Sequence, residues 1–245
     1  MGTQKRKMHK ISNDYYGNDI RRKKGEIKMK VNKLLKGILC SMFCLTTLVG
    51  CSGESPYKQI AEAKTLDFNG IPVYIEPDEK TLQMTIDKYF KQLEKQPDYL
   101  MKNCTEIHFQ CEDIFIKRML DEGFVQNETE AELISGSTTN TTVYMNTRTK
   151  KLGSIDVDEN DFKETLTHEL WHVYDDTHQI GDSYPSDNVQ IVSIYNQNPS
   201  LLGEYGATNT LEFFAEAGEM YIYEPDKLKE KSIDLYNYFE SLPKE

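Results

Sequence analysis

His168 and His172 stand four residues apart in the pentapeptide His-Glu-Leu-Trp-His, with Glu169 directly after the first histidine. In a helix, residues four apart lie on one face, one turn above the other. The two imidazoles can then reach one metal ion, while Glu169 projects beside it to hold the attacking water of a hydrolysis reaction. Chance also produces this pattern, but here it takes up the chain's only Trp and two of its five His. The spacing predicts a metal centre with one Zn²⁺ per chain.

A catalytic zinc ion needs a third protein ligand, and Glu212 is one candidate. It lies in a segment, 208–217, that begins with residues typical of helix caps and continues with strong helix formers. Glu216 is four residues further on and shares its face. We expect Glu212 to bind the metal and Glu216 to accept a hydrogen bond from a ligand imidazole. The reverse assignment fits the spacing equally well.

His178 is the alternative third ligand, six residues after His172. Metzincin proteases use that spacing, with a Gly midway that lets the chain turn back. Asp175 occupies that position here and tolerates a left-handed conformation better than most residues. Met220, which would have to form the accompanying Met-turn, lies in a segment that reads as a continuous helix. The helical pattern therefore counts against His178.

The motif with both histidines, followed by Tyr205-Gly and by Glu212-Phe-Phe-Ala-Glu216, resembles the catalytic domain of anthrax toxin lethal factor. It resembles still more closely the small secreted zinc proteases known as Pro-Pro endopeptidases. The similarity extends from Thr165 to the C-terminus. It implies that Glu212 is the third ligand and that Tyr205 lies across the metal from Glu169. A preference for proline near the cleaved bond is likewise implied only by this resemblance.

These residues together predict a zinc-dependent metalloendopeptidase that cleaves an extended peptide or protein. Glu169 would take a proton from the attacking water and pass it to the leaving amine. The Tyr205 hydroxyl would stabilise the oxyanion of the tetrahedral intermediate. The alternative is that the chain is not an enzyme but a surface protein, which keeps the fold, binds a partner and no longer catalyses a reaction. A protein that only binds has no use for Glu169, so its presence favours the enzyme.

The pattern of elements predicts an α+β fold of the zincin type, with a small mixed sheet. An edge strand would line the cleft, one helix would carry the two histidines, and a second would carry the glutamate ligand. Strands are expected at 71–76 and 105–110, and helices at 79–95, 112–122, 161–176, 208–217 and 225–238. The pieces 132–136 and 141–146 read as a hairpin with a Ser/Thr/Asn turn. We expect the segment Gly136–Asn146 to pair with an extended substrate.

The N-terminal region has a different composition from the rest of the chain. Of 29 basic and 40 acidic residues, the first 50 hold 12 and 3, which leaves 17 and 37 for the remainder. Residues 1–28 form a basic extension that should not fold, and Met29 is a plausible true start. Residues 29–50 have the architecture of a signal peptide, and Leu-Val-Gly before Cys51 resembles the lipobox of bacterial lipoproteins. We expect lipidation at Cys51, a tether over 51–59 and a protease domain over 60–245.

These features predict an extracytoplasmic lipoprotein, anchored to the bacterial membrane through its N-terminal lipid and monomeric. The net charge of −20 after residue 50 makes nucleic acid an unlikely partner, because phosphate repels such a surface. Cys104 and Cys111 are the only other cysteines outside the signal peptide. An extended strand between them would hold them about 20 Å apart, too far for a disulfide, so we expect both to be free.

Overall fold

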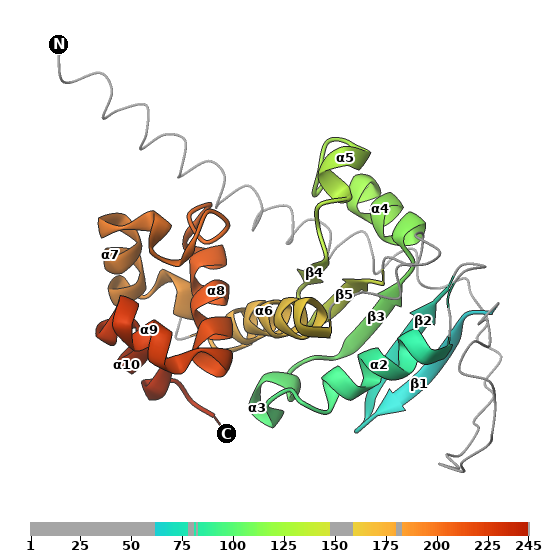
Figure 1. Ribbon diagram of the computed structural model, residues 1–245, viewed down its shortest axis with the longest axis horizontal. Helices are drawn as coiled ribbons and strands as arrows, with labels where there is room; N and C mark the ends of the chain where they lie inside the picture. The colour runs from blue at the N-terminus through green and yellow to red at the C-terminus, as the bar shows by residue number, and fades with distance from the viewer. Residues whose placement is uncertain (1–61, 78–80, 82, 148–158, 180–182, 245) are drawn as a thin grey trace. The chain divides into compact units, whose positions relative to one another are not determined.

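In the computed structural model of the protein, the residues described are 62–77, 81, 83–147, 159–179 and 183–244 (Figure 1). The predicted extension, signal peptide, tether and lipidation site at Cys51 lie outside these residues. Every helix in the described part of the chain is too short or too polar to span a lipid bilayer.

A five-stranded mixed sheet forms one half of the domain, in the order β1-β2-β3-β5-β4. Its strands are β1 (Lys64–Phe68), β2 (Ile71–Glu76), β3 (Glu106–Gln110), β4 (Gly136–Thr139) and β5 (Thr142–Asn146). The three central strands run parallel, and β1 and β4 are each antiparallel to their neighbour. The outermost strand on one side is therefore β4, which pairs with β5 through Thr138 and Val143.

Two helical layers cover this sheet because its strands alternate buried side chains between two faces. On one face, strand residues such as Val143 and Met145 pack in a single core with α2 (Gln83–Leu93) and α6 (Glu159–Thr177). On the other face, Tyr144 packs against the smaller cluster under the remaining helices of this half. These are α4 (Glu112–Asp121) and α5 (Glu128–Ala131); the short α3 (Asp98–Met101) contacts α6.

The second half of the domain is helical and gathers around the far end of α6 (Figure 1). Its helices are α7 (Val189–Gln197), α8 (Thr210–Tyr223), α9 (Pro225–Lys231) and α10 (Ile233–Ser241). Two 3₁₀ turns, η1 (Pro185–Asp187) and η2 (Pro199–Leu202), complete it. Helix α6 therefore runs from the sheet into the helical half and belongs to both.

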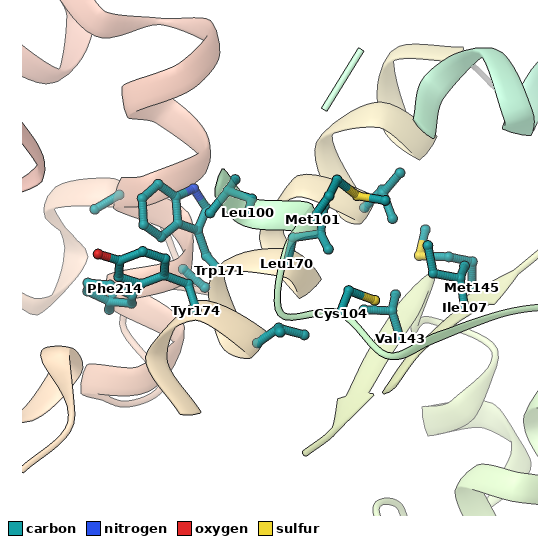
Figure 2. Close-up of a cluster of buried hydrophobic side chains, with 14 of the residues drawn as sticks. Leu100, Met101, Cys104, Ile107, Val143, Met145, Leu170, Trp171, Tyr174 and Phe214 are labelled. Carbon is teal, nitrogen blue, oxygen red and sulfur yellow. The ribbon is translucent and has the colours of Figure 1, made fainter. Parts of the chain in front are cut away.

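One continuous hydrophobic core joins the two halves through α6 (Figure 2). Trp171 is fully buried, with its ring 5.0 Å from that of Tyr174 and 5.7 Å from that of Phe214 on α8. Figure 2 shows these three rings on one side of α6, and Val143 of the sheet on the other. The fold is thus of the α+β class with a small mixed sheet, as the sequence predicts.

Two details of the predicted fold were wrong. Of the strand expected at 132–136, residues 132–135 form a turn and an irregular stretch after α5, and the residues of the expected Ser/Thr turn belong to strand β4. The chain reverses only at Asn140, which adopts a left-handed conformation (φ 55°). The helix expected at 225–238 divides at Ser232, whose extended backbone and side chain cap α10 by accepting a hydrogen bond from the Leu235 amide (3.2 Å).

Candidate metal centre

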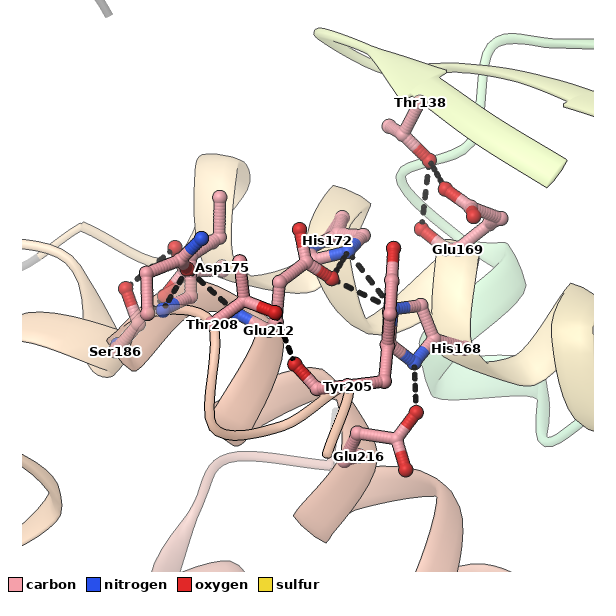
Figure 3. A network of polar contacts seen from close by, with 12 residues as sticks. Thr138, His168, Glu169, His172, Asp175, Ser186, Tyr205, Thr208, Glu212 and Glu216 are labelled. Carbon is pink, nitrogen blue, oxygen red and sulfur yellow. Dashed lines mark hydrogen bonds and ion pairs between the residues drawn. The ribbon is translucent and has the colours of Figure 1, made fainter. Parts of the chain in front are cut away.

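His168 and His172 project from the same side of α6 at the junction between the two halves (Figure 3). Their ring centroids are 4.8 Å apart and their planes are inclined by 80°. The helix cannot rotate to release them, because Leu170 and Trp171 between them are fully buried. Only 6% of the His168 side chain and 11% of the His172 side chain are exposed. Packing of α6 thus fixes two imidazoles at the edge of the core.

Glu212 reaches the histidines from the first turn of α8, whose start is set by Asn209. The Asn209 side chain accepts hydrogen bonds from the backbone amides of Leu211 and Glu212, each at 2.9 Å. This is a typical N-cap, and it determines where the first turn of the helix presents its side chains. A carboxylate in that turn is also favoured by the positive end of the helix dipole.

The three side chains meet in a triangle of possible ligand atoms. Nε2 of His168 lies 3.0 Å from Oε2 of Glu212 and 3.1 Å from Nε2 of His172. The third side, from Nε2 of His172 to Oε2 of Glu212, measures 3.3 Å. Ligand atoms bound about 2.0–2.1 Å from a tetrahedral zinc ion are about 3.3–3.4 Å from one another. The triangle is nearly that size, so these donors fit a zinc ion.

Charge in this cluster is also arranged to receive a cation. Burial opposes ionisation of Glu212, yet the neighbouring His172 and His168 hold its pKa well below the usual range. Burial likewise opposes a charge on His168, but Glu212 and Glu216 raise its pKa well above its ordinary value. Without a metal ion, therefore, a proton on His168 balances the carboxylates around it.

Glu216 supports His168 from behind, as its place one turn after Glu212 suggests. Its Oε1 lies 3.3 Å from Nδ1 of His168, the ring nitrogen turned away from the triangle. Such a carboxylate fixes the orientation of a ligand imidazole and increases its basicity. Glu219 forms a second group of potential metal ligands with His168 and Glu216. Burial, together with the charge of Glu216, raises the pKa of Glu219 to about 7. Nδ1 of His172 is buried and has no comparable partner among the described residues.

Glu169 points from α6 toward strand β4. Its Oε2 accepts a 2.7 Å hydrogen bond from the hydroxyl of Thr138, which also lies 3.0 Å from the Glu169 backbone oxygen. Thr138 was not among the predicted site residues, because its contact with Glu169 joins two segments that no local motif relates. Its only sequence signal is its position in the segment expected to form the edge strand.

Tyr205 lies in the loop before α8, with its ring centroid 5.5 Å from that of His168. The residue as a whole is 57% exposed, but burial of the phenol group and the nearby Glu212 raise its pKa far above the ordinary value. Thr208 fixes the loop by donating a 2.6 Å hydrogen bond to the Tyr205 backbone oxygen. The phenol therefore keeps its proton and can act as a hydrogen-bond donor at the site.

His178 is not part of the metal-ligand triangle. Its ring stacks on Tyr174 at 3.7 Å, and its Nδ1 lies 3.0 Å from the Tyr174 backbone oxygen. In the described part of the chain, the groups of side chains able to hold one metal ion are His168, His172 and Glu212, and His168, Glu216 and Glu219. Met220 is helical, within α8. The arrangement gives the metzincin alternative no support. Cys104 and Cys111 are both buried and are not joined by a disulfide.

The model of one protein family, glucose-regulated metallo-peptidase M90, matches residues 78–242, more than half of the chain. The chain belongs to the M90 metallopeptidases. The matched range contains the triangle, Glu169, Thr138 and Tyr205, and membership of this family implies a metal ion and a peptide substrate. Cys51 lies outside that range.

A solved structure is distantly similar to this M90 chain. The solved structure of the Pro-Pro endopeptidase PPEP-2 from Paenibacillus alvei is similar over 70% of this chain and 97% of its own, with 16% sequence identity and a TM-score of 0.48. No curated protein matches the sequence. The family match confirms the predicted metallopeptidase at the level of the M90 family, while the lethal-factor group stays a prediction.

Proposed function

We propose that this chain is a zinc metalloendopeptidase whose metal is bound by His168, His172 and Glu212. The triangle of two imidazole nitrogens and one carboxylate oxygen, with sides of 3.0–3.3 Å, is the observation that carries this proposal. It offers the donor types that zinc prefers at a spacing close to that of a tetrahedral site, and three ligands leave a fourth position for water.

When bound, zinc lowers the pKa of a water molecule and polarises the substrate carbonyl. The remaining steps belong to the chain. Glu169 takes the proton of the attacking water on its carboxylate and later gives it to the nitrogen of the leaving amine. Tyr205, held protonated by its surroundings, donates a hydrogen bond to the oxyanion of the tetrahedral intermediate. Glu216 accepts from Nδ1 of His168 and keeps that ring oriented.

The substrate we propose is an extended segment of a peptide or protein that pairs with β4. This strand ends the sheet order, so it is suited to adding a further strand through its backbone. The resemblance of the Tyr205–Glu216 motif to the Pro-Pro endopeptidases also predicts cleavage beside proline. Mapping cuts in a proteome-derived peptide library by mass spectrometry tests both points.

We further propose that the enzyme is a monomer attached to the outer side of the cell membrane by lipid on Cys51. The support is the signal-peptide architecture and the lipobox-like sequence before Cys51. Fractionation of cells that express the full chain tests this placement. The wild-type protein should sediment with membranes, and the Cys51→Ser variant should not.

Glu169→Gln is the decisive variant for the enzymatic proposal. It should abolish peptide cleavage while purified protein still contains one zinc ion per chain, because Glu169 is not a ligand. Glu212→Ala should lose both zinc and activity, whereas His178→Ala should keep both. Loss of zinc from the His178 variant, with zinc retained by the Glu212 variant, would reverse the ligand assignment. A wild-type protein that bound zinc and cleaved no library peptide would favour the binding protein instead.

A further inference from the structure

Glu169, the proposed general base, has a hydrogen-bond partner on the edge strand that no sequence motif indicates. The Thr138 hydroxyl lies 2.7 Å from Oε2 of Glu169, and Thr138 is itself buried. A hydrogen bond to a carboxylate is charge-assisted, and such bonds are shorter and stronger than those between neutral groups. Glu169 is only 5% exposed, so few water molecules are available to replace this donor.

Gly136, two residues earlier on the same face of β4, forms the other part of the contact. A Cβ at this position would lie 2.8 Å from Cγ2 of Thr165, 2.9 Å from Cγ of Glu169 and 3.1 Å from its Oε1. Only glycine allows the strand to approach the Glu169 side chain so closely. The carboxylate is therefore held by packing along its stem and by a hydrogen bond at one oxygen.

We infer that Thr138 is a positioning residue that holds Glu169 in the orientation required of the general base. The inference rests on the proposed function, in which Glu169 accepts the proton of the attacking water. Occupation of Oε2 by Thr138 leaves Oε1 as the oxygen that accepts this proton. Because β4 is also the strand proposed to pair with the substrate, one element fixes both the scissile bond and the base.

The Thr138 hydroxyl can serve Glu169 throughout the reaction. It has one hydrogen and two acceptors within reach, Oε2 and the backbone oxygen of Glu169. It donates to Oε2 while the carboxylate is charged. Once Glu169 carries the proton taken from water on Oε1, Oε2 is still an acceptor, so the hydroxyl can keep its hydrogen bond while the proton passes to the leaving amine. Valine has the same shape and cannot donate, whereas serine can.

The first test compares Thr138→Val with Thr138→Ser in the zinc-loaded protein. Misplacement of a catalytic group by about 1 Å costs about 100-fold in rate, so Thr138→Val should lower kcat about 10- to 100-fold. KM should change little and zinc content should stay at one per chain. Thr138→Ser should recover most of the lost kcat. A wild-type kcat in Thr138→Val, or an equal loss in Thr138→Ser, would overturn the inference.

Thr177→Val is the control. Thr177 lies on α6, as Glu169 does, but at the end of the helix, and its hydroxyl donates a 2.8 Å hydrogen bond to the backbone oxygen of Val173. The loss of this hydroxyl, away from the proposed substrate strand, should leave kcat unchanged. If Thr177→Val lowered kcat as much as Thr138→Val, the specific role of Thr138 would be refuted.

A second test does not depend on activity. In a double-mutant cycle, Thr138→Val should lower the melting temperature by about 2–6 °C when Glu169 is present, and by much less in a Glu169→Ala background. Equal shifts of the melting temperature in both backgrounds would show that the two side chains are not coupled and would refute the inference. If the wild-type protein cleaved no peptide, the proposed function would fail, and this cycle would still decide whether Thr138 holds Glu169.

Discussion

At the level of single residues, the metal centre combines two histidines with a larger number of carboxylates. Glu212 forms one corner of the triangle, and Glu216 and Glu219 form a second group with His168. A proton on His168 can offset only part of this negative charge, whereas a divalent cation offsets more and satisfies three donors at once. The same carboxylates that raise the pKa of His168 therefore prepare the site for a metal ion.

Zinc binding should consequently release a proton. Metal-free His168, with its raised pKa, is protonated at pH 7, but it must be neutral to bind zinc. We expect about one proton released per zinc ion at pH 7, and an affinity that falls as the pH drops below the pKa of His168. Calorimetric titration in two buffers of different ionisation enthalpy measures this number. Buffer-independent heats would contradict the protonated state.

Glu216→Gln provides the matched comparison for that titration. The amide keeps the size of the side chain but removes one of the three carboxylates that raise the pKa of His168. The variant should release fewer protons at pH 7, and its zinc affinity should fall about 10- to 100-fold because the ring is less firmly oriented. An unchanged affinity would remove Glu216 from the support of the metal centre.

Tyr205→Phe tests the other polar group at the site. The phenol of Tyr205 is proposed to donate to charge that develops only during the reaction, so its loss should lower kcat and kcat/KM to the same extent. Removal of one such donor typically costs about 100-fold in rate. Steady-state kinetics with one peptide suffice. An increase in KM at constant kcat would instead assign Tyr205 to substrate binding.

At the level of elements, the site depends on how closely α8 approaches α6. Gly218 on α8 faces Trp171, and a Cβ there would lie 2.5–2.6 Å from three atoms of the indole ring. Gly218→Ala should therefore push the two helices apart and destabilise the fold by about 1–3 kcal/mol. It should also weaken zinc binding, because Glu212 and the two histidines are on opposite helices. Chemical denaturation and zinc titration measure the two effects.

Gly206→Ala is the control for this substitution. A Cβ on Gly206 would be no nearer than 3.4 Å to its neighbours, which they can accommodate with small shifts. The change in the free energy of unfolding should stay within about 0.5 kcal/mol. Equal destabilisation by both alanines would mean that helix spacing is not what Gly218 provides.

The elements that the sequence predicted well are those with a strong local pattern. The segment that carries the histidines and the one that carries Glu212 have cap residues and helical spacing, and both are helices. The position of strand β4 was predicted wrongly because Gly136 and Thr138 have no such pattern. Their conformation is stabilised by contact with Thr165 and Glu169. Contacts between distant residues override weak local preferences of this kind.

The metal ligands could be named from sequence because the spacing of His168 and His172 is a property of a single helix. Glu212 required the resemblance to known proteases, since its position depends on the approach of a second helix. Thr138 could not be found in either way. It acts across 31 residues of sequence separation, through a hydrogen bond that exists only when the sheet packs on α6.

At the level of the whole molecule, the continuous core predicts that the metal centre and the fold are lost together. The core cluster includes sheet residues, Leu170 and Trp171 of α6, and Phe239 of α10, whose ring lies 5.1 Å from that of Trp171. Trp171 is the only tryptophan of the chain and lies next to His172. Its fluorescence therefore reports on the site itself, while circular dichroism reports on all helices.

We expect both signals to change in one coincident thermal transition, because no described part of the domain has a separate large core. Zinc at about 100 times its dissociation constant should stabilise the folded state by about 2.7 kcal/mol and raise the melting temperature by about 5–11 °C. Glu212→Ala should remove the effect of zinc and keep the single transition. If Trp171 became exposed well before the helices melted, the two halves would unfold separately, and α6 would not be the element that unites them.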